Sequence, residues 1–225
     1  TFGGDGTMLT VSSLAAMHRV PLAGVNLGRL GFMTTCSVQE LPLLAYALQE
    51  GSYLTDERSM LEVVRVGGDG VAAPPRKLAL NEVSLIRAQS GKMVDLDAEI
   101  DGELLNRYHA DGVLVSTPTG STAYSMSAGG PIVEPSARNL LITPICAHAM
   151  LTKTIVVSPE RVISVRIGKI GRHNAYLSVD GGRAFRLNTG DVITTKTAQK
   201  TTKLVRLKQT SFFDILNKKF IDRQR

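Results

Sequence analysis

The chain has 225 residues, of which 43% are hydrophobic and 20% are charged, and its formal net charge is +6. This length allows one large domain or two small ones with a packed core, and we expect neither a signal peptide nor a membrane span, which needs about 18 consecutive apolar residues. The positive charge suits an anionic partner, but the basic residues are scattered and only 5% of residues are aromatic, with no stacking platform for nucleic acid. Phosphorylated small molecules fit the charge equally well, so the charge alone does not identify the partner.

The first fifty residues are expected to form the later part of an α/β domain. Apolar side chains recur at helical spacing over residues 7–18 and 38–49, and Gly51 is a suitable helix stop. A short apolar strand is expected at 21–26. This order of elements is typical of a nucleotide-binding α/β domain. Because Thr1 lies only two residues before a Gly-rich motif, we also expect a preceding segment.

The pattern changes after about residue 59. Short β-rich runs separated by turns continue to about residue 207, and several alternate with period two, as residues 94–100 do. These runs predict an antiparallel region of two packed sheets. Residues 211–220 predict an amphipathic helix that is capped by Ser211 and packs back on the first domain. The predicted domains are residues 1–55 with the returning helix 210–225, and residues 56–209.

The cysteine and histidine residues give little sign of a metal or disulfide site. Cys36 and Cys146 lie far apart in apolar sequence, and we expect both to be buried free thiols in a reducing, cytoplasmic compartment. His18 and His173 are expected at the surface or at helix ends. No group of His, Cys and carboxylate residues has zinc-ligand spacing, so no structural metal held by the protein is expected.

The tetrapeptide Gly-Gly-Asp-Gly occurs twice, at 3–6 and at 67–70. The second copy lies between two strand-like runs, and Gly and Asp favour tight hairpins because they tolerate positive φ. The first copy precedes a helix, so its backbone N–H groups and the positive helix end converge where a phosphate could bind. Asp5 lies inside this loop as a candidate base. We therefore expect the first copy to be functional and the second to be a turn.

Three further stretches accompany the first copy: GVNLGRLGFMT at 24–34, LNEVSL at 80–85 and ADGVLVSTPTGSTAYSMSAGGPIVEP at 110–135. In this order and spacing the chain closely resembles NAD kinases, and the resemblance extends to the terminal FFDILNKKF run. It implies transfer of the ATP γ-phosphoryl group to the adenosine ribose 2′-OH of NAD. It also implies an α/β, Rossmann-like N-terminal domain, here truncated, an all-β, sandwich-like C-terminal domain, and a last helix that returns to the first domain.

The resemblance further implies roles for individual residues. Asp5 would be catalytic and accept the 2′-OH proton, while Gly3, Gly4 and Gly6 would let the ATP phosphates approach the backbone. Asp5 and Gly6 also belong to the implied NAD site. The other NAD-binding positions implied are Phe32 at the adenine, Asn81 and Glu82 at the ribose, Asp111 at the nicotinamide amide, Lys92, His109, Thr122, Ala123, Tyr124 and Ser127.

One physical difficulty attends the ribose pair. Adjacent residues of a strand point to opposite faces, so Asn81 and Glu82 need a bulge or a strand end to reach one sugar. An ordinary Asp is also a weak base towards a hydroxyl. The value of Asp5 would therefore lie in its position and in the stabilisation of phosphate charge by Mg²⁺ and dipoles.

Mg²⁺ is expected to arrive with ATP. By resemblance, the active unit is a homodimer or homotetramer in which Tyr124 reaches a dinucleotide site completed by a neighbouring subunit, with no nucleic-acid or membrane partner. Three departures from the family pattern put fine substrate contacts in question. They are Thr10 in place of Arg, Gly182 in place of Gln, and the run CAHAML at 146–151.

Two other interpretations stay open at this point. A lipid kinase of the diacylglycerol or sphingosine type also uses Gly-Gly-Asp-Gly, but it resembles this chain only near residues 3–6. A non-catalytic NAD(P)-binding regulatory protein would not require Asp5. Asn81, Glu82 and the TGSTAY run favour a dinucleotide acceptor over a lipid, and the presence of Asp5 argues against a protein without turnover, although Gly182 keeps that alternative open.

Overall fold

The computed structural model describes residues 1–28, 31–88, 92–148, 152–169, 175–209 and 211–223. The chain forms two compact units. Unit 1 comprises Thr1–Arg58 and Lys200–Arg225, and unit 2 comprises Ser59–Gln199. Among the described residues, no helix is long and apolar enough to cross a membrane.

Unit 1 is a small α/β assembly. Its elements are α1 (Asp5–His18), β1 (Val25–Asn26), β2 (Cys36–Ser37), η1 (Val38–Glu40), α2 (Leu41–Glu50) and α4 (Phe212–Arg223), together with the adjoining ends of β3 (Leu54–Val66) and β14 (Val192–Arg206). β1 and β2 pair in parallel, so the predicted strand at 21–26 is shorter than expected. Its remainder makes one isolated bridge, from Leu22 to Leu204.

The helices of unit 1 begin and end where local sequence signals indicate. α1 begins at Asp5, two residues before the predicted start, with Gly4 as its N-cap. α2 ends at Gly51, whose φ of 66° lies in the left-handed region that glycine adopts without a Cβ penalty. The hydroxyl of Ser211 accepts the N–H of Phe213 at 3.2 Å, as predicted for a helix N-cap.

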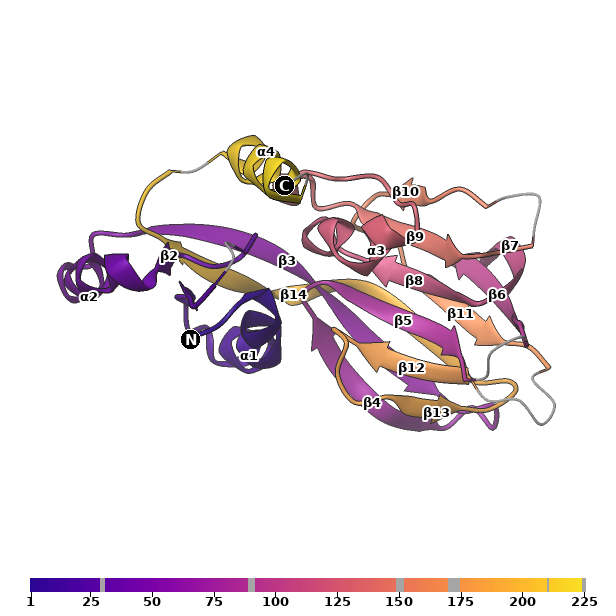
Figure 1. The fold of residues 1–225 in the computed structure, drawn as a ribbon. Helices are drawn as coiled ribbons and strands as arrows, with labels where there is room; N and C mark the ends of the chain where they lie inside the picture. The colour runs from indigo at the N-terminus through magenta and orange to yellow at the C-terminus, as the bar shows by residue number, and fades with distance from the viewer. Residues whose placement is uncertain (29–30, 89–91, 149–151, 170–174, 210, 224–225) are drawn as a thin grey trace. The chain divides into compact units, whose positions relative to one another are not determined.

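The described residues form two six-stranded sheets, and most of their strands belong to unit 2 (Figure 1). One sheet has the order β10-β9-β8-β5-β12-β13, and the other has the order β4-β3-β14-β11-β6-β7. The remaining elements are β4 (Ala72–Ala79), β5 (Glu82–Arg87), β6 (Val94–Ile100), β7 (Glu103–Ala110), β8 (Gly112–Ser116), η2 (Thr119–Thr122), α3 (Tyr124–Ser127), η3 (Pro135–Ala137), β9 (Leu140–Ile145), β10 (Ile155–Val157), β11 (Ile163–Ile167), β12 (Ala175–Val179) and β13 (Phe185–Leu187). Neighbours such as β5 and β8 run antiparallel. This architecture confirms the predicted fold class.

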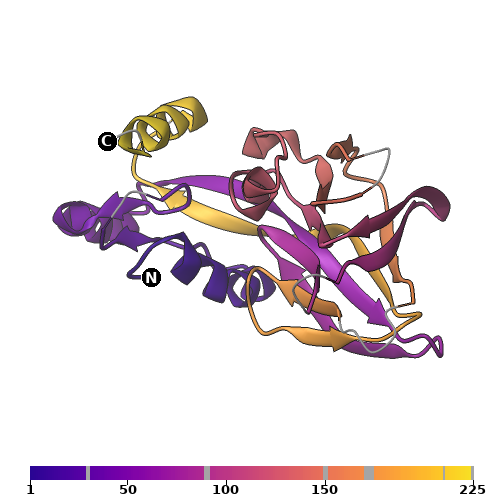
Figure 2. The same ribbon diagram turned by 45° about the vertical axis from the view of Figure 1, so that its right-hand side comes forward.

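Period-two alternation decides which face of the first sheet is apolar. Val83 and Leu85 of β5 and Val113 and Val115 of β8 are fully buried in one hydrophobic core, together with residues from the other sheet. Since side chains alternate across a strand, the residues between them point to the opposite face. That face carries polar residues at Glu82 and Ser116 next to apolar ones such as Leu114, and α3 lies beside β8 and β9 in both ribbon views (Figures 1 and 2). The candidate site begins at the polar residues of this face.

The second Gly-Gly-Asp-Gly copy forms a hairpin turn between β3 and β4. The Gly70 N–H donates to the Gly67 carbonyl oxygen at 2.8 Å, and the Val71 N–H donates to Asp69 Oδ1 at 3.0 Å. Gly70 has a φ of 80°, which an L side chain rarely adopts. The predicted turn is confirmed.

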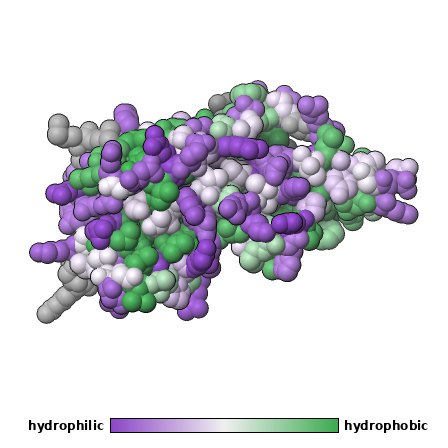
Figure 3. All heavy atoms as spheres, turned by 180° about the vertical axis from the view of Figure 1, so that it is seen from behind, coloured by the Kyte–Doolittle hydropathy of each residue, from purple (hydrophilic) through white to green (hydrophobic). Residues whose placement is uncertain are grey.

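The two cysteines have different environments. Cys36 is buried with Val25 and Leu44 in the core of unit 1, as predicted. Cys146 is exposed, so the prediction of two buried thiols is wrong. Cys146 directly follows β9 and has a φ of 47°, and this turn takes its side chain out of the apolar strand pattern. His18 is exposed, and His173 lies outside the described residues. On the face drawn in Figure 3, hydrophobic areas are interspersed with hydrophilic residues.

Candidate functional site

The first Gly-Gly-Asp-Gly copy forms the loop that starts α1 in unit 1. Gly3 has a φ of 147°, and a Cβ there would collide with the side chain of Thr7, so only glycine fits. A Cβ on Gly4 or Gly6 would meet no atom within 4 Å. The start of α1 leaves backbone N–H groups without intrahelical partners, beside two glycines that leave space open. This arrangement has the chemistry of an anion-binding loop.

The carboxylate of Asp5 is fixed by a loop far away in the sequence. Oδ2 accepts the N–H of Phe32 at 2.8 Å, and Oδ1 accepts the N–H of Met33 at 3.0 Å. A Cβ on Gly31 would collide with the same carboxylate and displace it, so glycine leaves room for Asp5 in this position. Residues 31–33 therefore set the position of Asp5.

Arg206, at the end of β14, holds the same loop through its carbonyl groups. Its guanidinium donates to the carbonyl oxygens of Phe32 at 3.1 Å and Thr34 at 2.8 Å, and it also donates to Asp56 Oδ2 at 3.1 Å. The loop is thus bound by a carboxylate at its N–H groups and by a guanidinium at its carbonyl groups. No local sequence signal indicated Arg206, because its partners lie more than 140 residues earlier.

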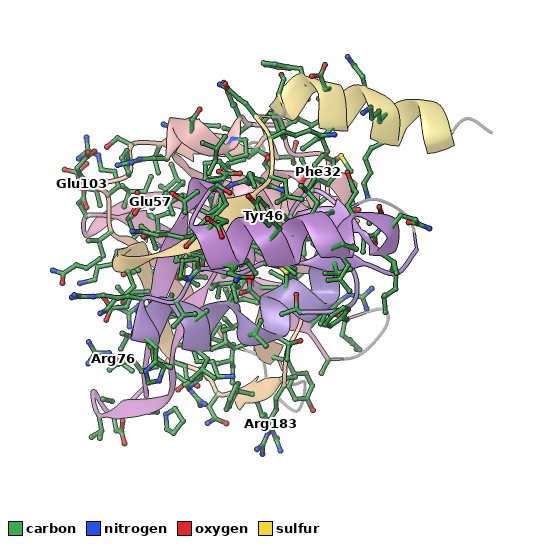
Figure 4. The ribbon with its side chains drawn as sticks, turned by 90° about the vertical axis from the view of Figure 1, so that its left-hand side faces the viewer. Phe32, Tyr46, Glu57, Arg76, Glu103 and Arg183 are labelled. Carbon is green, nitrogen blue, oxygen red and sulfur yellow. The ribbon has the colours of Figure 1, made fainter. Side chains whose placement is uncertain are left out.

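The side chain of Phe32 lies against α4 (Figure 4). Its ring centroid is 6.4 Å from that of Phe212, and Lys219 Nζ is 5.2 Å from the ring centroid in a cation–π contact. Both partners belong to unit 1. The half-buried aromatic ring is therefore flanked by another ring and by a cation.

In unit 2, Asn81 and Glu82 lie at the start of β5 on the polar side of the first sheet. Their exposed fractions are only 6% and 7%. Glu82 is the first residue of the strand and Asn81 precedes it, so the pair lies at a strand end. The structure thus has a strand end at these two residues, one of the two features that would let them face one ligand.

A carboxylate from another strand binds the backbone of this strand end. Asp180 Oδ2 accepts the N–H of Leu80 at 2.7 Å, while Oδ1 accepts those of Asn81 at 2.8 Å and Glu82 at 3.1 Å. Asp180 itself follows β12 and has a φ of 50°. Sequence reasoning touched this turn only at Gly182 and missed Asp180, although the dipeptide Asp-Gly marks a turn.

Three buried oxygen atoms at this strand end have no hydrogen-bond partner within the described part of the chain: Asn81 Oδ1, Glu82 Oε2 and Ser116 Oγ. Ser116 ends β8 directly opposite Glu82 in the β5–β8 register, where paired Cβ atoms lie about 5 Å apart. A buried oxygen without a partner costs about 1–3 kcal/mol. The cluster is suited to a ligand that supplies hydroxyl groups. Sequence reasoning missed Ser116 as well.

The Glu82 carboxyl has a pKa close to neutral pH. Burial, followed by the nearby negative charge of Asp180, raises the pKa of the Glu82 carboxyl to about 7. Burial also raises the pKa of the Tyr124 hydroxyl, with further contributions from Asp111, Cys146 and Glu82. Asp111 and Glu82 therefore each interact electrostatically with Tyr124.

The run that contains Tyr124 is anchored to the same strand end. The Thr117 hydroxyl donates to the Leu80 carbonyl oxygen at 2.6 Å, and the Thr117 N–H donates to that of Asn81 at 2.9 Å. A Cβ on Gly120 would collide with the Asn81 backbone, so glycine is required for this close approach. Further along the run, Thr122 and Ala123 are half-buried, Tyr124 is 38% exposed and Ser127 is exposed.

The outer predicted positions are less closely grouped. Asp111 forms an ion pair with Arg87, with Nε and Oδ1 at 2.5 Å; Arg87 was not predicted. His109 lies on β7 in the other sheet, where its Nδ1 is 2.7 Å from Asp95 Oδ1. Lys92 is exposed, and no contact described for this chain links it to Glu82. No three His, Cys, Asp or Glu side chains gather as a metal-binding group in the described ranges.

The sequence matches the two domains of one protein family. Residues 1–53 match the ATP-NAD kinase N-terminal domain, and residues 80–207 match the ATP-NAD kinase C-terminal domain. The chain belongs to the ATP-NAD kinase family. It is 39% identical to the NAD kinase of Thermoanaerobacter sp. (strain X514), over 98% of this chain and 77% of that protein. It is 41% identical to the NAD kinase of Symbiobacterium thermophilum, over 96% of this chain and 76% of that protein.

Solved NAD kinase structures have the same fold. The yeast NADH kinase complexed with NADH aligns with a TM-score of 0.86 and 32% identity, over 96% of this chain and 62% of that one. The NAD kinase from Archaeoglobus fulgidus in complex with ATP aligns with a TM-score of 0.77 and 30% identity, over 97% of this chain and 80% of that one. Family membership confirms the predicted NAD kinase, a phosphotransferase, and disfavours a lipid kinase.

Proposed function

We propose that this NAD kinase chain uses ATP to phosphorylate the adenosine ribose 2′-OH of NAD, and that Asn81, Glu82 and Ser116 form its ribose site. The main support is the cluster of three buried oxygens without a described partner. Two adjacent ribose hydroxyls would donate to Asn81 Oδ1 and Glu82 Oε2, and the Ser116 hydroxyl can both donate and accept. Binding would then relieve the cost of the buried, unpartnered atoms.

The phosphate groups of ATP belong at the loop of Gly3, Gly4 and Gly6. The open space at Gly4 and Gly6 would admit them to the start of α1, where the helix dipole favours negative charge. Asp5 is the proposed acceptor of the 2′-OH proton. Its two loop N–H donors use only part of its acceptor capacity, so the carboxylate can receive a hydroxyl without releasing the loop.

Mg²⁺ is the proposed metal and would be held mainly by the ATP phosphates and water. This fits the donor set, since the described residues include no three-ligand group and Mg²⁺ commonly takes only one or two carboxylates in such sites. When bound, it would neutralise phosphate charge during transfer.

The other NAD-binding positions that the resemblance implies are also proposals, and the structure supports some of them more than others. Tyr124 interacts electrostatically with both Asp111 and Glu82, which supports a common dinucleotide site with Thr122, Ala123 and Ser127. Phe32 suits an adenine ring because its aromatic face is already bordered by Phe212. Lys92 and His109 rest on the resemblance alone.

The assembly rests on the resemblance alone. A homodimer or homotetramer with Tyr124 at a shared site is a proposal, and the 38% exposure of Tyr124 is compatible with it. A cytoplasmic location likewise stays a prediction, as do the domain limits at residues 55 and 210.

The test is NADP formation by the purified chain with ATP, Mg²⁺ and NAD, alongside calorimetric titration with NAD. We expect turnover that Glu82→Gln weakens through the KM for NAD. NAD binding without NADP formation would favour the non-catalytic alternative. Failure to bind NAD would contradict the proposed ribose site.

A further inference from the structure

We propose that Asp180 is a positioning residue for the ribose site, which shapes the strand end so that Asn81 and Glu82 face the same ligand. This inference rests on the proposed NAD-binding role of Asn81 and Glu82. Asp180 lies 98 residues or more from the backbone it binds. The resemblance to NAD kinases gave Asp180 no role in the site.

The hydrogen bonds to Asp180 are incompatible with a regular strand. In a strand, successive N–H groups point in opposite directions, yet three consecutive N–H groups, from Leu80 to Glu82, converge on this one carboxylate. The backbone therefore curls around Asp180 before β5 begins. The Asp180 N–H in turn donates to the Glu82 carbonyl oxygen at 3.0 Å, which fixes the carboxylate to the strand that it shapes.

This curl resolves the difficulty that adjacent strand residues pose. In a regular strand, Asn81 and Glu82 would point to opposite faces. Instead, both are buried to more than nine tenths, and each retains an oxygen with no partner among the described residues. Asp180 is thus placed to turn two neighbours into a pair of acceptors for adjacent hydroxyls.

The turn that carries Asp180 is itself specialised. Asp180 and Gly181 have φ values of 50° and 65°, and the Gly182 N–H closes the turn on the Val179 carbonyl oxygen at 2.9 Å. The Ser178 hydroxyl donates to the Gly182 carbonyl oxygen at 3.0 Å. A non-glycine residue with positive φ is costly and persists where its surroundings require it. Here the three N–H groups that donate to the Asp180 carboxylate hold the residue in this conformation.

Asp180 also acts on the protonation of Glu82. Its negative charge contributes to the raised pKa of Glu82, after burial itself. The other groups that interact electrostatically with this pair are Lys77 of β4, beside Asp180, and Tyr124 of α3, beside Glu82. Asp111 and Cys146 act on Tyr124 from the adjoining turns. The ionised Glu82 is the better acceptor for ribose hydroxyls, so NAD binding should strengthen as pH rises through neutrality.

The experiment measures the Kd for NAD by calorimetry at pH 6 and pH 8, without ATP. With a Glu82 pKa of about 7, the ionised fraction rises from roughly a tenth to roughly nine tenths, so the wild-type Kd should fall about tenfold. Asp180→Asn keeps an oxygen for two N–H groups but loses the charge. We expect its Kd to be about fivefold weaker at pH 8, because one backbone bond is lost, and to depend on pH somewhat less than in the wild type, because burial remains the main cause of the raised Glu82 pKa.

Asp180→Glu separates geometry from charge. It retains the negative charge on a longer side chain, so the steep pH dependence should persist while NAD binds about fivefold more weakly. Should Asp180→Asn fail to fold, this variant still decides the matter, because wild-type affinity in Asp180→Glu would overturn the proposal. An Asp180→Asn protein that folds and binds NAD with wild-type affinity at pH 8 would also overturn it.

Asp191→Asn is the matched control. Asp191 is a buried turn aspartate of the same unit that accepts the Asn188 N–H at 2.8 Å and pairs with Arg65. Its substitution should lower the thermal unfolding temperature but leave the NAD Kd and its pH dependence within twofold. An equal change of pH dependence in both variants would assign Asp180 a merely structural role. If wild-type protein does not bind NAD, the proposed function itself fails, which is a distinct outcome.

Discussion

The two Gly-Gly-Asp-Gly copies contain the same four residues in different surroundings. Asp5 binds N–H groups 27 and 28 residues further along the chain, at Phe32 and Met33. Asp69 binds the N–H of Val71, only two residues away. The first aspartate is held by tertiary structure at the start of a helix, whereas the second closes a local turn between two paired strands. An identical tetrapeptide thus serves different purposes, because the elements that follow it differ.

The largest effect on activity is expected from a substitution in the first copy. Asp5→Asn should lower kcat by about 10²–10⁴-fold, because the proposed proton acceptor is lost. The Kd for NAD should change less than twofold. Steady-state NADP formation and calorimetry provide the two measurements, and a near-normal kcat would remove Asp5 from the mechanism.

Glu82 differs from both aspartates in its burial: Asp5 is half-buried and Asp69 is exposed, whereas the Glu82 carboxylate is buried. Glu82 has its folded-state pKa raised from 4.5 to about 7, so its protonated form favours the folded state. The contribution of Glu82 to the free energy of unfolding should therefore be fully present below pH 4.5 and be lost as pH rises to about 7. The loss from this one group is on the order of 3 kcal/mol.

Glu82→Gln removes this titration. Urea unfolding at pH 5 and pH 8 should show that the variant loses about 2 kcal/mol less than the wild type between those conditions. Parallel pH profiles of the two proteins would contradict the raised pKa.

A smaller effect concerns the loop that holds Asp5. Gly31→Ala places a Cβ against the Asp5 carboxylate and should lower kcat by about tenfold through displacement of that group. Gly28→Ala is the control for a Cβ as such, because it lies three residues before Gly31 and a Cβ there meets no atom within 4 Å. NADP-formation rates distinguish them, and equal kcat values for Gly31→Ala and wild type would mean that the loop does not position Asp5.

The smallest effect is expected at the second copy. Asp69→Asn should leave kinetics within twofold and the free energy of unfolding within about 0.5 kcal/mol, because Asn can accept the same local N–H and tolerates turns. Thermal unfolding and NADP formation check both. A large loss of activity would mean that the second copy also acts in catalysis.

The sequence by itself determined the features that depend on short stretches of chain. Helical spacing and the glycine after it located α2 and its end at Gly51, and period-two alternation predicted antiparallel sheets. Turn chemistry distinguished the copy at Gly67–Gly70 from the one before α1. The ordered motifs then indicated the family. These features are local because backbone preference and side-chain alternation act over a few residues.

Only the tertiary structure decided which distant groups meet. Asp180 reaches Leu80 across 100 residues, and Arg206 reaches Thr34 across 172. Ser116 faces Glu82 because of the β5–β8 register. Cys146, which sequence context predicted to be buried, turns out of its strand through one left-handed residue. Such partners follow from strand register and chain crossing, which depend on the packing of the whole core. A local pattern fixes the direction of a side chain along its own element, but not the group that it meets.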